Sequence, residues 1–141
     1  MTYDMKIVSA CLAGVKCRYD GESQPCDKIL ELVRNGEAIP VCPEQMGGLP
    51  TPRAQAEQQG TKVITKDGVD VTNEFHRGAI EVLNLAKLVG CKEAILKSKS
   101  PSCGSGIVYD GTFTGTLIEG DGVLVRLLKE NGIKVFRDDE I

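Results

Sequence analysis

The sequence has little aromatic character: it contains no tryptophan, one histidine and only 4% aromatic residues among 141. Proteins that bind single-stranded nucleic acid stack the bases on aromatic side chains, so this composition argues against that class. The formal net charge of −3, from 17 lysines and arginines against 20 aspartates and glutamates, argues against a general nucleic-acid-binding or membrane-surface protein. A local basic pocket is still compatible with this charge balance.

Long apolar segments are also lacking. No apolar run approaches the length that spans a bilayer, and the first residues lead directly into a short strand-like segment without the layout of a signal peptide. We therefore expect a cytoplasmic protein that does not bind membranes. Because 41% of the residues are hydrophobic, a chain of this length can bury a core without disulfides or metals, and we expect one domain over residues 1–141.

The cysteines lack the spacing of a common metal or redox motif. No C-x-x-C pair occurs, which argues against a zinc ribbon and a thioredoxin-type redox pair. They are also too sparse for a disulfide framework, so we expect reduced thiols that pack in the core or bind metal. The six are Cys11, Cys17, Cys26, Cys42, Cys91 and Cys103.

Short apolar runs alternate with amphipathic segments along the chain, a pattern typical of parallel strands joined by helices. Strands are expected at 6–11, 37–42, 91–97 and 133–136, and helices at 27–35, 73–89 and 123–131. Asp-Gly turns predict two small hairpins, at 62–72 and 107–115. We therefore expect an α/β fold with a three-layer, Rossmann-like, mainly parallel sheet and small β-hairpin excursions.

The stretch 97–106, Lys-Ser-Lys-Ser-Pro-Ser-Cys-Gly-Ser-Gly, combines hydroxyls, positive charge and a thiol directly after the apolar run 94–96. A flexible Gly/Ser connector would not need a cysteine between Pro-Ser and Gly after a buried strand. We interpret this stretch as a functional loop. Its candidate residues are Lys97, Lys99, Ser100, Ser102 and Cys103.

Cysteines stand at the carboxyl ends of three predicted strands. Cys11, Cys42 and Cys103 each follow a strand, and Cys17 lies in the loop after the first. Ligands of parallel α/β sheets bind at this edge, so we expect these four thiols to meet in space. Four thiolates could form a closed zinc site, although structural zinc ligands usually come in close pairs. Cysteines on separate loops better suit an iron–sulfur cluster, which three thiolates would hold with one iron open to substrate.

Charged and hydroxyl side chains accompany these cysteines in the same loops. Glu44 and the hydroxyls of Ser100 and Ser102 are candidates to move protons, although a solvent-exposed Glu44 without function fits the sequence equally well. Basic side chains would offset thiolate charge or hold an anionic substrate. These are Arg18, Arg53, Lys97 and Lys99.

Three motifs, SACLAGVKCRYDG, VCPEQMGGLPTPR and KSKSPSCGSG, occur in this order and together resemble the DUF523 family, whose characterised members include the thiouracil desulfidases. The resemblance implies a 4Fe-4S cluster on three cysteines and a hydrolytic, non-redox removal of sulfur, as sulfide, from a small thiolated pyrimidine base or nucleotide. The family's cysteine positions fall at Cys11, Cys17, Cys42 and Cys103, with Cys11 and Cys103 the preferred ligands and the third left open. Its acid/base and hydroxyl positions fall at Glu44 and Ser100.

Two other functions fit the same residues. One is a metal- or cluster-binding module without catalysis, in which all four cysteines are coordinated. The other is a metal-free enzyme that uses Cys103 as nucleophile and Glu44 as base. In each case we expect a small-molecule partner rather than a long nucleic acid, and the sequence does not indicate an oligomeric state.

Overall fold

The computed structural model describes residues 4–141, and a parallel sheet of four strands in the order β2-β1-β5-β8 forms its centre. The pairs β1–β2, β1–β5 and β5–β8 are all parallel, which confirms the predicted α/β architecture. Ile7 and Val8 in β1 are fully buried, as expected for a strand covered on both faces. The strands are β1 (Lys6–Ser9), β2 (Ala38–Val41), β5 (Glu93–Leu96) and β8 (Lys134–Arg137).

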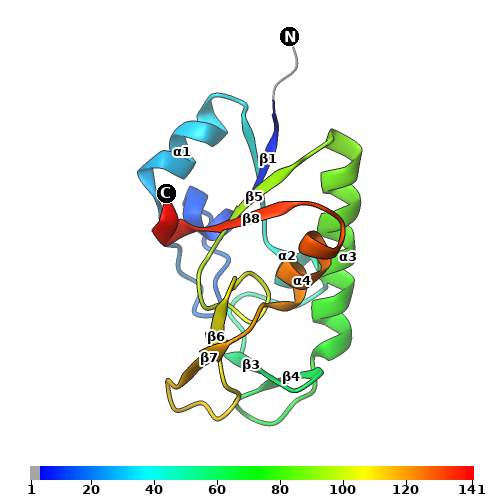
Figure 1. Ribbon diagram of the computed structural model, residues 1–141. Helices are drawn as coiled ribbons and strands as arrows, with labels where there is room; N and C mark the ends of the chain where they lie inside the picture. The colour runs from blue at the N-terminus through cyan, green and yellow to red at the C-terminus, as the bar shows by residue number, and fades with distance from the viewer. Residues whose placement is uncertain (1–3) are drawn as a thin grey trace.

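Helices cover both faces of this sheet and give three layers (Figure 1). Successive residues of a strand face opposite sides: Val8 packs in a cluster with Ile29 of α1, whereas Ile7 packs with Phe75 of α3 and Leu124 of α4. Among residues 4–141, no helix combines the length and apolarity needed to cross a membrane. The helices of the two outer layers are α1 (Asp27–Arg34), α3 (Thr72–Val89) and α4 (Val123–Glu130).

A short helix, α2 (Pro43–Met46), follows β2 and was not predicted. It lies so close to α3 that glycine is required on both sides of the contact. A Cβ on Gly47 would overlap the carbonyl oxygen of Glu74, and a Cβ on Gly78 would overlap that of Pro43. This contact fixes the position of α2 and of the residues at its N-terminus.

The first hairpin lies beyond the carboxyl ends of the sheet strands (Figure 1). One of its two strands differs from the predicted one. The strand β4 (Lys62–Thr65) pairs with β3 (Ala56–Gln59), which precedes it. The segment predicted as its partner contributes only an isolated bridge at Asp70, because α3 begins at Thr72. The strand β3 escaped prediction because three of its four residues are polar.

The second hairpin is wider than predicted. The strand β6 (Ile107–Tyr109) pairs with β7 (Leu117–Glu119), so a loop over 110–116 replaces the expected tight turn at Asp110-Gly111. The buried carboxylate of Glu57, in β3, shapes this loop. Its Oε1 accepts hydrogen bonds from the backbone N–H groups of Gly111 at 2.9 Å and Phe113 at 3.1 Å. The two hairpins are therefore docked onto each other.

Candidate functional site

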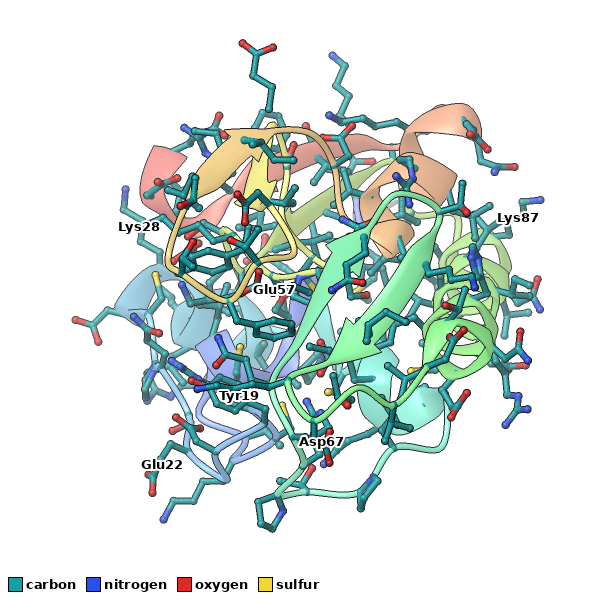
Figure 2. All side chains as sticks on the ribbon, turned by 90° about the horizontal axis from the view of Figure 1, so that it is seen from below. Tyr19, Glu22, Lys28, Glu57, Asp67 and Lys87 are labelled. Carbon is teal, nitrogen blue, oxygen red and sulfur yellow. The ribbon has the colours of Figure 1, made fainter. Side chains whose placement is uncertain are left out.

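A cavity of about 300 Å³ lies at the carboxyl ends of β1, β2 and β5 and is lined by four cysteines. Cys11 lies in the 3-10 turn η1 (Ala10–Ala13) that follows β1. Cys17 belongs to the next loop, Cys42 is the N-cap of α2, and Cys103 lies in the loop after β5. Figure 2 views this end of the molecule, with Tyr19 of the cavity wall labelled near the centre. The topology thus brings together the four cysteines that the strand order predicted.

Hydroxyl groups fix the loop that holds Cys103. The Oγ atom of Ser9 accepts a hydrogen bond from the backbone N–H of Lys97 at 2.9 Å. The Oγ atom of Ser100 accepts two more, from the N–H groups of Ser102 at 3.1 Å and Cys103 at 3.0 Å. Because a serine hydroxyl has two acceptor lone pairs and one hydrogen, Ser100 keeps its hydrogen to donate elsewhere.

The thiols of Cys11 and Cys103 are held in their neutral form. Burial raises the pKa of Cys11 to about 11, and the nearby Cys42 adds to this rise. Burial likewise raises the pKa of Cys103 well above its ordinary value. A positively charged metal centre would reverse both effects, because metals bind the thiolate and release its proton.

Cys17 and Cys42 form a hydrogen-bonded pair. This hydrogen bond lowers the pKa of Cys42 to about 7 and raises that of Cys17. The Sγ atom of Cys42 also lies 3.7 Å from the carbonyl oxygen of Cys17. The hydrogen bond therefore favours the thiolate form of Cys42 over that of Cys17.

The donor set suits an iron–sulfur cluster better than a single metal ion. Within residues 4–141, no three cysteine, histidine, aspartate or glutamate side chains are grouped closely enough to hold one ion, as a zinc site would require. All six cysteines are free thiols, and a cluster of several irons holds its ligands farther apart than one ion does. Soft sulfur donors on separate loops of one cavity match this requirement.

A carboxylate and a guanidinium form an ion pair in the cavity wall. Nε of Arg53 donates a hydrogen bond to Oε2 of Glu44 at 2.8 Å, and Nη2 lies 2.6 Å from the same oxygen in an ion pair. The two side chains are only 7% and 16% exposed. Glu44, whose alternative interpretation was a solvated surface glutamate, is thus held inside the site.

The cavity brings together all but one of the residues predicted for the site. The exception is Ser102, which is fully buried and whose Oγ has no partner among the described residues. Its carbonyl oxygen accepts a hydrogen bond from the N–H of Leu124 in α4, and Ser102 is not among the residues that line the cavity. The predicted residues that line the cavity are Cys11, Cys17, Arg18, Cys42, Glu44, Arg53, Lys97, Lys99, Ser100 and Cys103.

Several further cavity residues were not predicted as site residues, and three of them have side chains suited to contact a ligand. Tyr19 and Tyr109 bring aromatic rings from the first loop and from β6, and Gln24 lies beside them in the lining. The Nη1 atom of Arg18 donates to Oε1 of Gln24 at 2.6 Å. Tyr19 could have been predicted as a site residue because it lies within a cysteine-containing motif, whereas the sequence around Tyr109 contains no such signal.

Comparisons with known proteins agree with this fold and identify the family. A family model described as 2-thiouracil desulfurase matches residues 7–140. The chain is 42% identical over 147 aligned positions to the uncharacterized protein YbbK of Bacillus subtilis (strain 168), with 97% of each covered. It is also similar to the solved structure of TudS (DUF523Vcz), described as a 4Fe-4S-dependent thiouracil desulfidase, with a TM-score of 0.94 and 47% identity over 98% of this chain and 93% of that one. The chain therefore belongs to the 2-thiouracil desulfurase family, as its three DUF523-like motifs predicted.

Proposed function

We propose that this protein is a desulfidase that converts a small thiolated pyrimidine and water into the corresponding oxo-pyrimidine and hydrogen sulfide. The C=S bond is replaced by a C=O bond whose oxygen comes from water, and no electrons are gained or lost. The observation that supports this function most directly is the convergence of four thiols, Glu44 and Ser100 in one cavity. Membership of the desulfurase family supports the same reaction.

We further propose that the cavity binds a 4Fe-4S cluster, the cofactor named for the similar TudS structure. Cys11 and Cys103 would be two of its three ligands, and either Cys17 or Cys42 the third. Such a cluster would supply a Lewis-acidic iron for the substrate sulfur. Because the ligands must be reduced thiols, we expect the protein to act in the cytoplasm.

The chain's own residues would bind the substrate and move protons. The Glu44 carboxylate would accept a proton from the attacking water, and the Ser100 hydroxyl would donate its hydrogen to the substrate. Lys97 and Lys99 give the cavity wall positive charge. Tyr19 and Tyr109 provide aromatic faces against which a flat pyrimidine ring can pack.

The size of the cavity favours a small substrate. Ligand cavities commonly measure about 300 to 1,000 Å³, and this one, at about 300 Å³, lies at the lower end of that range. A cluster would fill part of this volume and leave room for one base. We therefore propose a thiouracil or its nucleotide, rather than a long nucleic acid, as the substrate.

The test is anaerobic reconstitution followed by activity assays. Protein loaded with about four irons and four sulfides per chain should release sulfide from 2-thiouracil or 4-thiouridine monophosphate, with uracil or uridine monophosphate as the co-product. Cys103→Ser should lose both iron and activity. Cys26→Ser is the matched control, because Cys26 is half-buried outside the cavity and should retain both.

Two results would overturn the proposal. If the protein holds an intact cluster but releases no sulfide from any thiopyrimidine, the result would favour a cluster-binding module without catalysis. Full activity after complete chelation of iron would instead favour the metal-free reaction with Cys103 as nucleophile.

A further inference from the structure

The guanidinium of Arg53 lines the cavity, and each of its three nitrogens contacts an acceptor on the protein. Nε donates to Oε2 of Glu44, with which Nη2 forms an ion pair at 2.6 Å, and Nη2 donates to the carbonyl oxygen of Cys17 at 2.9 Å. Nη1 donates to the carbonyl oxygen of Pro50 at 3.2 Å and to Oγ1 of Thr51 at 3.0 Å. A guanidinium has five N–H donors and no acceptor. Within residues 4–141, four of these donors form hydrogen bonds with the protein, and the remaining N–H is on Nη2, the nitrogen in the ion pair with Glu44. The guanidinium is therefore held by the protein rather than free to bind an anionic substrate.

These contacts join three separate segments of the cavity wall. Arg53 ties the loop of Cys17 to the first turn of α2, which contains Glu44, and ties both to its own loop. Its backbone N–H adds a hydrogen bond to the carbonyl oxygen of Tyr19 at 2.8 Å. A single residue thus fixes a candidate cluster ligand and the candidate proton acceptor relative to each other.

The Glu44–Arg53 pair also separates two cavities. Both side chains line the cysteine cavity and a second cavity of about 190 Å³. The second cavity has mostly apolar walls, which include Val69, Val71 and Phe75. A carboxylate against such a wall loses solvation, and a charged, hydrogen-bonded partner offsets this loss. Arg53 is that partner.

We propose that Arg53 is a positioning residue that holds the Glu44 carboxylate and the Cys17 loop in place for the reaction, and that it does not bind the substrate. This inference rests on the proposed desulfidase function for its kinetic part only. Its second part, that Arg53 holds the Cys17 loop and so shields the Cys17 thiol, does not depend on that function and can be tested without a cluster.

The kinetic test is Arg53→Lys, which keeps the positive charge but cannot span acceptors on three segments, because its donors share one nitrogen. If Arg53 positions Glu44, kcat for sulfide release should fall at least about tenfold while KM changes by less than about twofold. A substrate-binding Arg53 would instead give a raised KM with an unchanged kcat. The matched control is Arg126→Lys, since Arg126 donates to Gln58 outside the cavity, and it should behave as the wild type.

The second test needs no cluster and no activity. In the reduced, cluster-free protein, Cys17 is 2% exposed, and its alkylation by iodoacetamide can be followed by mass spectrometry with half-buried Cys26 as the internal reference. Arg53→Lys should speed the labelling of Cys17 relative to Cys26 at least about fivefold, because it removes the Nη2 hydrogen bond on the carbonyl oxygen of Cys17, while the backbone bond to Tyr19 remains. Arg126→Lys should leave this ratio unchanged.

A milder variant keeps the proposal testable if Arg53→Lys does not fold. Thr51→Val removes one acceptor of Nη1 with little change in shape, and should lower kcat about two- to fivefold without raising KM. A raised KM in either variant, or an unchanged Cys17 labelling ratio in folded Arg53→Lys, overturns the proposal. Absence of sulfide release by the loaded wild-type protein would overturn the desulfidase function alone, and the labelling ratio would still decide whether Arg53 holds the Cys17 loop.

Discussion

Ser9 joins the ends of β1 and β5 at the base of the cavity by accepting a hydrogen bond from the backbone N–H of Lys97 at 2.9 Å. The same hydroxyl is hydrogen-bonded to the thiol of Cys103. This bond lowers the pKa of Cys103 and so opposes the larger effect of burial, which raises it. Ser9 is 3% exposed, so water cannot replace it. One buried hydroxyl therefore connects the sheet, the Lys97 loop and a candidate cluster ligand.

The loss of this hydroxyl should destabilise the fold. Ser9→Ala leaves the N–H of Lys97 without its acceptor, and an unsatisfied buried donor costs about 1–3 kcal/mol. Urea unfolding of the cluster-free protein should show this decrease in the free energy of unfolding. The control is Ser98→Ala, a half-buried serine of the same loop, which should change stability by less than about 0.5 kcal/mol. Equal stabilities of the two variants would contradict this role of Ser9.

Ser100 should be needed for its hydroxyl, because that group both shapes the turn and retains a hydrogen to donate. Ser100→Ala removes the acceptor of the Ser102 and Cys103 N–H groups, and should lower kcat about 100-fold or more and reduce the iron bound per chain. Ser100→Thr keeps the hydroxyl and should retain most of the bound iron and at least about a tenth of the activity. Iron analysis and sulfide release measure the two effects. A Thr variant as defective as the Ala variant would show that the hydroxyl is not what matters.

The sheet and the cysteine cavity could be predicted because both depend on local patterns combined with a topological rule. Apolar runs without alternation indicated buried parallel strands, and the carboxyl ends of such strands share one edge. That rule was enough to bring Cys11, Cys42 and Cys103 together from positions far apart in the sequence. The spacing of the cysteines alone argued only against a zinc ribbon and a thioredoxin-type redox pair.

The features that were missed depend on long-range packing. Helix α2 has four residues, too few to show a helical period, and its position depends on the close approach of Gly47 to α3. Tyr109 reaches the cavity only because of how the β6–β7 hairpin docks. Ser102 and Ser100 look alike in a serine-rich loop, and only the packing beneath α4 buries one and leaves the other in the cavity wall.

Gly78→Ala tests whether the contact between α2 and α3 positions the site. Alanine is favoured over glycine in a helix by about 1 kcal/mol, but a Cβ here would overlap the carbonyl oxygen of Pro43. The clash should dominate and reduce the free energy of unfolding by about 1–3 kcal/mol. Because Pro43 lies between Cys42 and Glu44, sulfide release should also fall. Glu81→Ala, on the exposed face of α3, is the control, and a stabilised Gly78→Ala protein would contradict the argument.

Glu57 tests whether the docking of the two hairpins supports substrate binding. Glu57→Ala leaves the N–H groups of Gly111 and Phe113 without their acceptor, and should reduce the free energy of unfolding by about 2–3 kcal/mol. Because the loop continues from β6, loosening it should also displace Tyr109 from the cavity wall and raise KM for the thiopyrimidine more than it lowers kcat.

Glu57→Gln separates the hydrogen bonds of this residue from its charge. Glutamine keeps an acceptor oxygen at the same place, so it should lose only about 1 kcal/mol, the difference between a charged and a neutral acceptor, and should keep KM near the wild-type value. Glu119→Ala, an exposed substitution on β7, should change neither quantity. If Glu57→Ala alters stability but not KM, Tyr109 does not contact the substrate. If Glu57→Gln is as unstable as Glu57→Ala, the charge of the carboxylate, rather than its geometry as an acceptor, holds the loop.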